Sequence, residues 1–159
     1  MKTTRVGSLI GLAVIAGLVS YLVEALLVRL GEPQFIPPIT LGVALFFIGV
    51  IIPVMAWPIR KTTRATEDSP KSAPVDPFYA TRVLLLAKAG ALTGAVLAGV
   101  GLGIVVFVVT RVVLASTPLV LTLISMIGGV VLSVGGVIAE RWCQIPPTDA
   151  EGLEEGELA

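Results

Sequence analysis

Apolar residues fill four long runs of this chain, separated by short polar stretches. The runs are Val6–Val28, Ile39–Trp57, Val83–Thr110 and Val112–Ala139. No charged residue lies between Ile39 and Trp57, and as a helix this run is about 29 Å long, close to the hydrocarbon thickness of a bilayer. Because lipid offers no partners for backbone N–H and C=O groups, such runs must form helices. The pattern predicts an all-α membrane protein with four transmembrane helices in an antiparallel bundle.

The segments between these runs define the boundaries of the expected domain. We expect a transmembrane domain over residues 1–147, with spans at about 6–28, 39–57, 83–110 and 117–139 and a polar loop at 58–81. Gly31 follows the first run and is a suitable C-terminal helix cap. Asp76 and Pro77 are typical of an N-cap and a first helical position, so the third helix could run from Pro77 to Thr110. Residues 148–159 carry five acidic and no basic side chains, which is typical of a disordered acidic tail. The composition agrees, since 55% of residues are hydrophobic and 14% are charged, against about 25% charged in soluble domains.

Basic residues are distributed unevenly between the two ends of the spans. Eight lie before the first span, between the second and third, or after the fourth, whereas only Arg29 and Arg111 lie on the opposite side. Cytoplasmic segments of membrane proteins are enriched in lysine and arginine. We therefore expect a multi-pass protein of the cell membrane with its N-terminus and C-terminus in the cytoplasm. The first apolar run is too long for a signal peptide and is interpreted as an uncleaved span.

Four short stretches resemble an actinobacterial family of four-pass membrane proteins, domain of unknown function family 3180. Two are common membrane-boundary sequences, Ile36–Thr40 and Ala56–Arg60, and two are more specific, Asp76–Ala89 and Ala139–Pro147. The resemblance extends over nearly the whole chain and implies the four-span architecture. It implies no catalytic residue, and it suggests a genomic context near folate-biosynthesis genes, from which a membrane-anchored partner of folate-pathway proteins is a weaker possibility.

The side chains that usually carry catalysis are scarce. The chain has no histidine and one cysteine, Cys143, which removes the commonest general base and metal ligand and leaves the thiol without a histidine to activate it. The glycines at 99, 101 and 103 lie within an apolar helix, without the strand-to-helix context of a nucleotide site. We expect no enzyme activity, no metal, no cofactor and no nucleic-acid partner.

Small residues recur on one side of the third and fourth predicted helices. In lipid, close backbone approach through small residues is a main route to helix association. We expect packing within the bundle, in preference to a dedicated dimer interface, through Gly90, Gly94, Gly128, Gly129 and Gly136.

A few charged residues lie within or beside the apolar runs, and each has a structural and a functional interpretation. They are Glu24, Arg82, Lys88, Arg111 and Glu140. Intramembrane charges often mark a functional path, but long side chains near a span end also extend to the headgroups. We expect Glu24 to pair with Arg111, and Lys88 to pair with Glu140, for which Arg82 and Arg141 compete.

Two functions remain open at this stage. The first is a non-enzymatic accessory or scaffold subunit that binds another membrane protein or a second copy of itself. The alternative is a small oligomeric transporter or channel with a polar path near Glu24, Lys88 and Glu140. Four helices with three scattered charges would need several copies to form such a path. The lipid bilayer is the one partner that the sequence itself requires.

Overall fold

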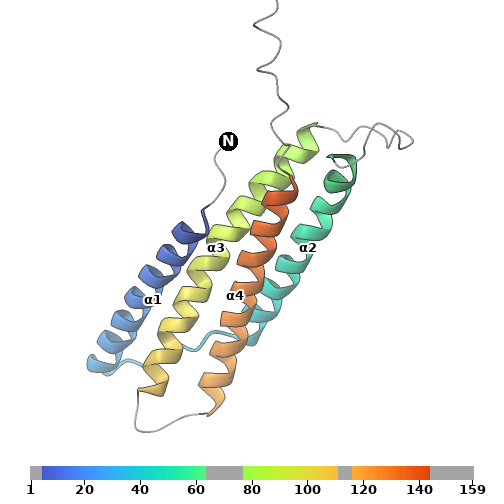
Figure 1. The fold of residues 1–159 in the computed structure, drawn as a ribbon. Helices are drawn as coiled ribbons and strands as arrows, with labels where there is room; N and C mark the ends of the chain where they lie inside the picture. Colours follow the sequence, from blue (N-terminus) through green and yellow to red (C-terminus); the bar gives the residue numbers. More distant parts are fainter. Residues whose placement is uncertain (1–4, 64–76, 111–115, 144–159) are drawn as a thin grey trace, which may run out of the picture.

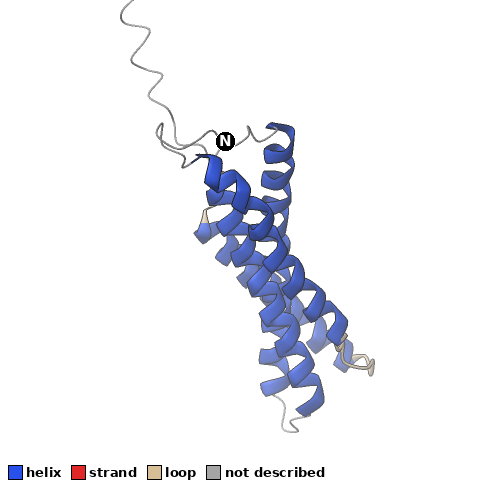
Figure 2. Ribbon diagram, turned by 90° about the vertical axis from the view of Figure 1, so that its right-hand side faces the viewer, coloured by secondary structure: helices blue, strands red, loops and turns tan. Residues whose placement is uncertain are grey.

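The computed structural model describes residues 5–63, 77–110 and 116–143, which form four helices. The helices are α1 (Val6–Arg29), α2 (Ile39–Thr63), α3 (Pro77–Val109) and α4 (Ser116–Trp142). Each is long and apolar enough to cross a membrane. Figure 2 shows only helices and short connections in the described part of the chain. The predicted all-α, four-span bundle is confirmed.

Two helices run beyond the spans expected from hydropathy. Helix α2 continues to Thr63, past Trp57, where the second expected span ended. The polar loop expected at 58–81 therefore contains the last six residues of α2. Helix α3 begins at Pro77, which confirms the start indicated by Asp76 and Pro77 and lies before the expected span. Hydropathy alone finds the part of a helix that lies in lipid, and it does not detect a helix end that extends into the polar region. The acidic tail at 148–159 lies outside the described residues.

The spatial order of the helices is α1, α3, α4, α2 (Figure 1). Helix α4 packs against both α3 and α2, and α2 touches α3 over a shorter stretch. Helix α1 contacts α3 alone, and the two run in the same direction. The connection from α1 to α2 must therefore pass α3 and α4, and residues 30–38 do so in Figure 1.

The end of α1 shows how this connection starts. Gly31 has a φ of 80°, a left-handed conformation that glycine adopts without strain. The N–H of Glu32 donates to the Leu27 carbonyl at 3.0 Å, and the N–H of Gly31 donates to the Val28 carbonyl at 3.2 Å. This pair of bonds is a Schellman motif, which satisfies the last carbonyls of the helix. The cap expected at Gly31 is confirmed.

One end of the bundle carries most of its basic side chains. Arg5 precedes α1, Arg60 lies near the end of α2, Arg82 near the start of α3 and Arg141 near the end of α4. We call this the basic end, and we call the opposite end, where residues 30–38 run, the loop end. Arg29 is the described basic residue of the loop end.

Candidate functional site

Helix α4 is packed on two sides through two consecutive glycine pairs. A Cβ atom at Gly128 or Gly135 would meet the backbone of Gly42 or Gly49 on α2. A Cβ at Gly129 or Gly136 would meet the backbone of Ala98 or Ala91 on α3, at 2.7 and 2.5 Å. The first glycine of each pair therefore allows α2 to approach, and the second allows α3 to approach. Such backbone proximity maximises dispersion contacts where lipid provides no hydrophobic drive.

The five glycines proposed for packing do not all serve one interface. Gly94 of α3 lies against Gly129 and Ser133 of α4, and Ser133 Oγ donates to the Ala91 carbonyl at 3.1 Å. Gly128 instead faces α2, and a Cβ at Gly90 would meet Ile52 of α2 at 2.8 Å. The spacing of small residues along one helix does not reveal that some of them face one neighbouring helix and the others face a second.

The α2 contact with α4 includes a carbonyl that lacks its usual helical donor. Pro53 has no N–H, so the carbonyl of Gly49 receives no i→i−4 hydrogen bond from it. Gly135 lies directly against this carbonyl. The missing side chain at Gly135 thus lets α4 cover a polar group of α2 that would otherwise face lipid, with a weak Cα–H···O contact as partial replacement.

Helix α1 is attached to α3 along a narrow line of small residues. A Cβ at Gly99 would meet the backbone of Ala13, and one at Gly103 would meet the Gly17 carbonyl. Ser20 Oγ donates to the Val100 carbonyl at 3.2 Å. Near the loop end, the rings of Tyr21 and Phe107 meet edge to face with centroids 5.8 Å apart. These contacts fix the position of α1 along α3, and they involve one face of α1.

Glu24, the acidic residue of α1, is buried, with 2% of its surface exposed. The backbone of Phe35, in the connection between α1 and α2, hydrogen bonds to its carboxylate. The Oε2 atom is buried, and no hydrogen bond from the described residues reaches it. Arg111, its expected partner, lies outside the described residues. The structure therefore places Glu24 where α1 and the connection meet, and the pairing with Arg111 stays a prediction.

The structure places Lys88 and Glu140 in different environments. Glu140 is 5% exposed on α4, whereas Lys88 is exposed on α3. This difference in burial does not favour a direct contact, and the pairing of the two residues stays a prediction. Arg82 is also exposed on α3. The physical reason is rotational: Lys88 lies one residue, or about 100°, around the helix from Ala87, which is fully buried.

Aromatic side chains close the basic end between α2 and α4. The rings of Trp57 and Trp142 meet edge to face with centroids 5.8 Å apart, and the guanidinium carbon of Arg60 lies 4.7 Å from the centroid of the Trp142 ring. Tyr79 of α3 donates its hydroxyl to the Met55 carbonyl at 3.2 Å. This cluster joins three helices where they leave the apolar region.

The chemistry of the remaining reactive groups is limited. Burial raises the pKa of the Cys143 thiol above its usual range, which lowers the fraction of reactive thiolate at neutral pH. In the described part of the chain, no group of three histidine, cysteine or carboxylate side chains is placed to hold a metal ion.

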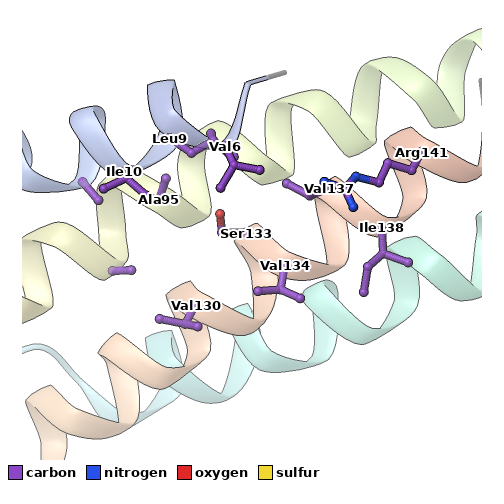
Figure 3. Close-up of a pocket in the computed structure, with 12 residues that line it drawn as sticks. Val6, Leu9, Ile10, Ala95, Val130, Ser133, Val134, Val137, Ile138 and Arg141 are labelled. Carbon is purple, nitrogen blue, oxygen red and sulfur yellow. The ribbon is translucent and has the colours of Figure 1, made fainter. Parts of the chain in front are cut away.

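An apolar groove lies between α1 and α4, with α3 as its floor (Figure 3). Its volume is about 390 Å³. Helix α1 contributes Val6, Leu9, Ile10 and Ala13, and α3 contributes Ala95 and Ala98. Helix α4 contributes Val130, Ser133, Val134, Val137, Ile138 and, at the basic end, Arg141. We call this the α1–α4 groove; Glu24, Lys88 and Glu140 do not line it. A second, smaller hollow lies between α1 and α3 alone.

The model of a protein family described as a protein of unknown function (DUF3180) matches residues 9–147. The chain belongs to this family. The match covers all four helices except the first residues of α1, so the fold described above is that of a DUF3180 protein. Neither a curated protein nor a solved structure matches the chain.

Two features of this DUF3180 structure were missed by sequence reasoning. The α1–α4 groove exists because α1 and α4 both pack on α3 and their backbones do not come close to each other, which no pattern along the chain reveals. Gly7 and Gly11 of α1 have open space where a Cβ would be placed. Their spacing of four residues is typical of a helix-packing surface and could have been noticed in the sequence. That no other helix covers this surface follows from the spatial order of the helices.

Proposed function

We propose that this protein is a non-enzymatic accessory subunit of another membrane protein, and that it binds its partner through the face of α1 turned away from α3. The observation that carries this proposal is the environment of its glycines. Fourteen glycines lie in the described helices, and twelve of them have another helix within 4 Å of the position of a Cβ. Gly7 and Gly11 are the two exceptions.

These two glycines lie one turn apart on the same face. Small residues spaced by four positions allow a second helix to approach the backbone closely. Leu9, which packs against Ala91 and Ala95 of α3, points to the opposite side of α1, because it lies two residues from each glycine. The free face also carries Ile15, Leu18 and Leu22, all at least 60% exposed. A transmembrane helix with small residues of its own is the partner that fits this surface.

The orientation belongs to the same proposal. We place the basic end, and with it both termini, on the cytoplasmic side, because basic residues collect there. Cysteine labelling on a Cys143→Ser background tests this assignment. A cysteine at Gln34 should react from outside intact cells, and one at Asp68 only after permeabilisation. The reverse pattern would overturn the orientation.

The docking proposal is tested by purification of the tagged protein from native membranes in mild detergent. The unmodified chain should retain a membrane partner, and Gly11→Leu should lose most of it. Ile15→Leu is the matched control, because it changes an exposed side chain of the same helix from one large apolar group to another. A partner held equally by Gly11→Leu and by the unmodified protein would refute docking at this face.

A small oligomeric transporter or channel is the second candidate, and Glu24 is the observation in its favour. One oxygen of this buried carboxylate receives no hydrogen bond from the described residues. Burying such a group in an apolar region costs free energy, and ionisable residues within membrane helices often mark an ion or proton path. Ion or solute flux through purified protein in liposomes, lost in Glu24→Gln, would favour this function over the accessory role. Absence of flux alongside a stable hetero-complex would favour the accessory role.

A further inference from the structure

The α1–α4 groove has the dimensions of one lipid chain. It follows α4 from Val130 to Arg141, a distance of about 16 Å at the helical rise of 1.5 Å per residue. The hydrocarbon core of a bilayer is about 30 Å thick, so one leaflet contributes roughly half of that. The hydroxyl of Ser133, on α4, is the polar group among the lining side chains apart from Arg141, and it already donates to the Ala91 carbonyl. The wall thus offers an acyl chain apolar contacts over the depth of a single leaflet.

The mouth of this groove is cationic, and its charges come from α3, from α4 and from Arg5, the residue before α1. Arg141 lines the groove directly, and Figure 3 shows its side chain extending past Val137 toward the groove. Leu9 packs on Ala91 and Ala95, so Arg5 and Val6, about one turn earlier, lie level with Lys88 of α3. Lys88 is two helical turns from Ala95, on the same side of α3.

Helix α4 brings Arg141 to nearly the same height. Gly136 lies against Ala87 and Ala91, and α4 runs opposite to α3, so Arg141 lies about one turn beyond Lys88 toward the basic end. No acidic residue lines the groove. Glu140 is buried, is engaged with other groups and does not line the groove, so the groove itself presents only positive charge.

We propose that the α1–α4 groove binds an anionic phospholipid of the leaflet at the basic end. One acyl chain lies along Ala13, Val130 and Val134, and the phosphate lies between Arg141 and Lys88, with Arg5 close by. An apolar slot one leaflet deep beneath a cluster of cations matches the two chemical parts of such a lipid. The proposal goes beyond the accessory role, because Gly7 and Gly11 lie on a different face of α1.

The bound lipid would stabilise the attachment of α1, the helix with the fewest neighbours in the bundle. Helix α1 touches α3 alone, and a lipid in the groove would bridge α1 to α4 through dispersion contacts. Occupancy should therefore protect α1 more than it protects α2 or α4.

The proposal is tested by native mass spectrometry of the full chain released from membranes that contain phosphatidylglycerol or phosphatidylcholine with the same acyl chains. We expect retained phosphatidylglycerol to exceed retained phosphatidylcholine. Arg141→Gln and Lys88→Gln should each lower the apparent affinity for phosphatidylglycerol roughly five-fold, from the usual contribution of a cation near an anionic lipid surface. Arg29→Gln removes the same charge at the loop end and should have no effect.

A second pair of variants tests the groove rather than the charge. Val134→Phe places a ring in the groove at an exposed position and should abolish retention, whereas Val54→Phe adds the same bulk on the exposed side of α2 and should be silent. Equal retention of the two lipids, or an equal loss in Arg29→Gln and Arg141→Gln, would overturn the proposal. So would normal retention by Val134→Phe. Loss of a protein dimer in Val134→Phe would show that a second copy of the chain occupies the groove instead.

Discussion

Helices α1 and α4 are both apolar and both contain closely spaced glycines, yet they occupy different positions in the bundle. Helix α4 is held on two sides, by Gly128 and Gly135 against α2 and by Gly129 and Gly136 against α3. Helix α1 is held on one side, where Ala13 and Gly17 meet α3, and its Gly7 and Gly11 meet nothing. The same residue type thus marks a completed interface in α4 and an open one in α1.

This difference suggests that α4 contributes mainly to the stability of the bundle and α1 mainly to binding. Where two backbones are in close contact, the interface cannot accommodate larger side chains without separating the helices. We therefore regard α4 with its neighbours as the rigid part of the molecule. A helix that packs on one line of contacts leaves adjacent surfaces free for lipid or protein. We therefore expect substitutions in the α3–α4 interface to change the free energy of unfolding, and substitutions on α1 to change what the protein binds.

The largest effect is expected from Gly94→Leu. A Cβ at this position would lie 2.7 Å from the Gly129 carbonyl oxygen and 2.8 Å from the Ser133 Cα, so α3 and α4 must separate. Overpacking of this kind costs about 1–3 kcal/mol, measurable by thermal unfolding in mild detergent. Val109→Leu, at an exposed position of the same helix, is the control. Equal melting temperatures for the two variants would contradict the rigid α3–α4 interface.

Gly103→Leu should have a smaller effect on global stability, because α1 can move outward without disturbing α4. The new side chain would collide with the backbone of Gly17. We expect a loss of about 1 kcal/mol or less in global unfolding, with local opening of α1. Hydrogen exchange should accelerate in α1 and remain slow in α4. Comparable acceleration in both helices would mean that α1 is not an independent part of the bundle.

The loop end of α1 depends on Glu24, and a double-mutant cycle tests its partner. If Glu24 and Arg111 interact, Glu24→Gln and Arg111→Gln should each destabilise the protein, and the double variant should recover part of the loss. A coupling energy in the range of roughly 0.5–3 kcal/mol is expected for residues in contact. Strictly additive changes in unfolding free energy would show that the two side chains do not interact.

The smallest effect is expected at the basic end of α2. Arg60→Gln removes the guanidinium from the face of Trp142, a contact worth about 0.5–1 kcal/mol at an accessible site. Arg82→Gln is the matched control, since Arg82 is an exposed arginine of the same end. Unfolding free energies should differ between the two variants by that amount, with a change in tryptophan emission for Arg60→Gln only. Identical behaviour would indicate that glycine contacts alone hold α2 to α4.

The sequence predicted the parts of the molecule that depend on local chemistry. Long apolar runs without charges predicted the four helices, and Gly31 predicted the end of α1, because both follow from backbone hydrogen bonding within a few residues. The position of the helix ends in the loop at 58–81 was less accurate, since α2 continues through Pro58 to Thr63. Polar residues past the membrane boundary carry no hydropathy signal for helix.

The candidate site was less accessible from sequence. Glu24, Gly94 and Gly136 were singled out by periodicity, and the structure buries all three between elements. The pairing of Lys88 with Glu140 stays a prediction, and the exposure of Lys88 beside the burial of Glu140 does not favour it, because the rotation of each helix about its own axis is set by its neighbours. Arg141 was expected to compete for Glu140, which stays a prediction, and its position at the mouth of a groove was not expected.

The sequence by itself determined that this chain has four membrane helices, where most of them begin and end, and which end is basic. The tertiary structure decided that α1 and α2 lie at opposite edges, that α4 divides its glycines between two neighbours, and that Gly7 and Gly11 remain uncovered. The physical reason is that hydropathy and capping act within one helix, whereas the choice of neighbour depends on the fit of two surfaces. Lipid-facing and helix-facing surfaces are equally apolar, so only shape distinguishes them.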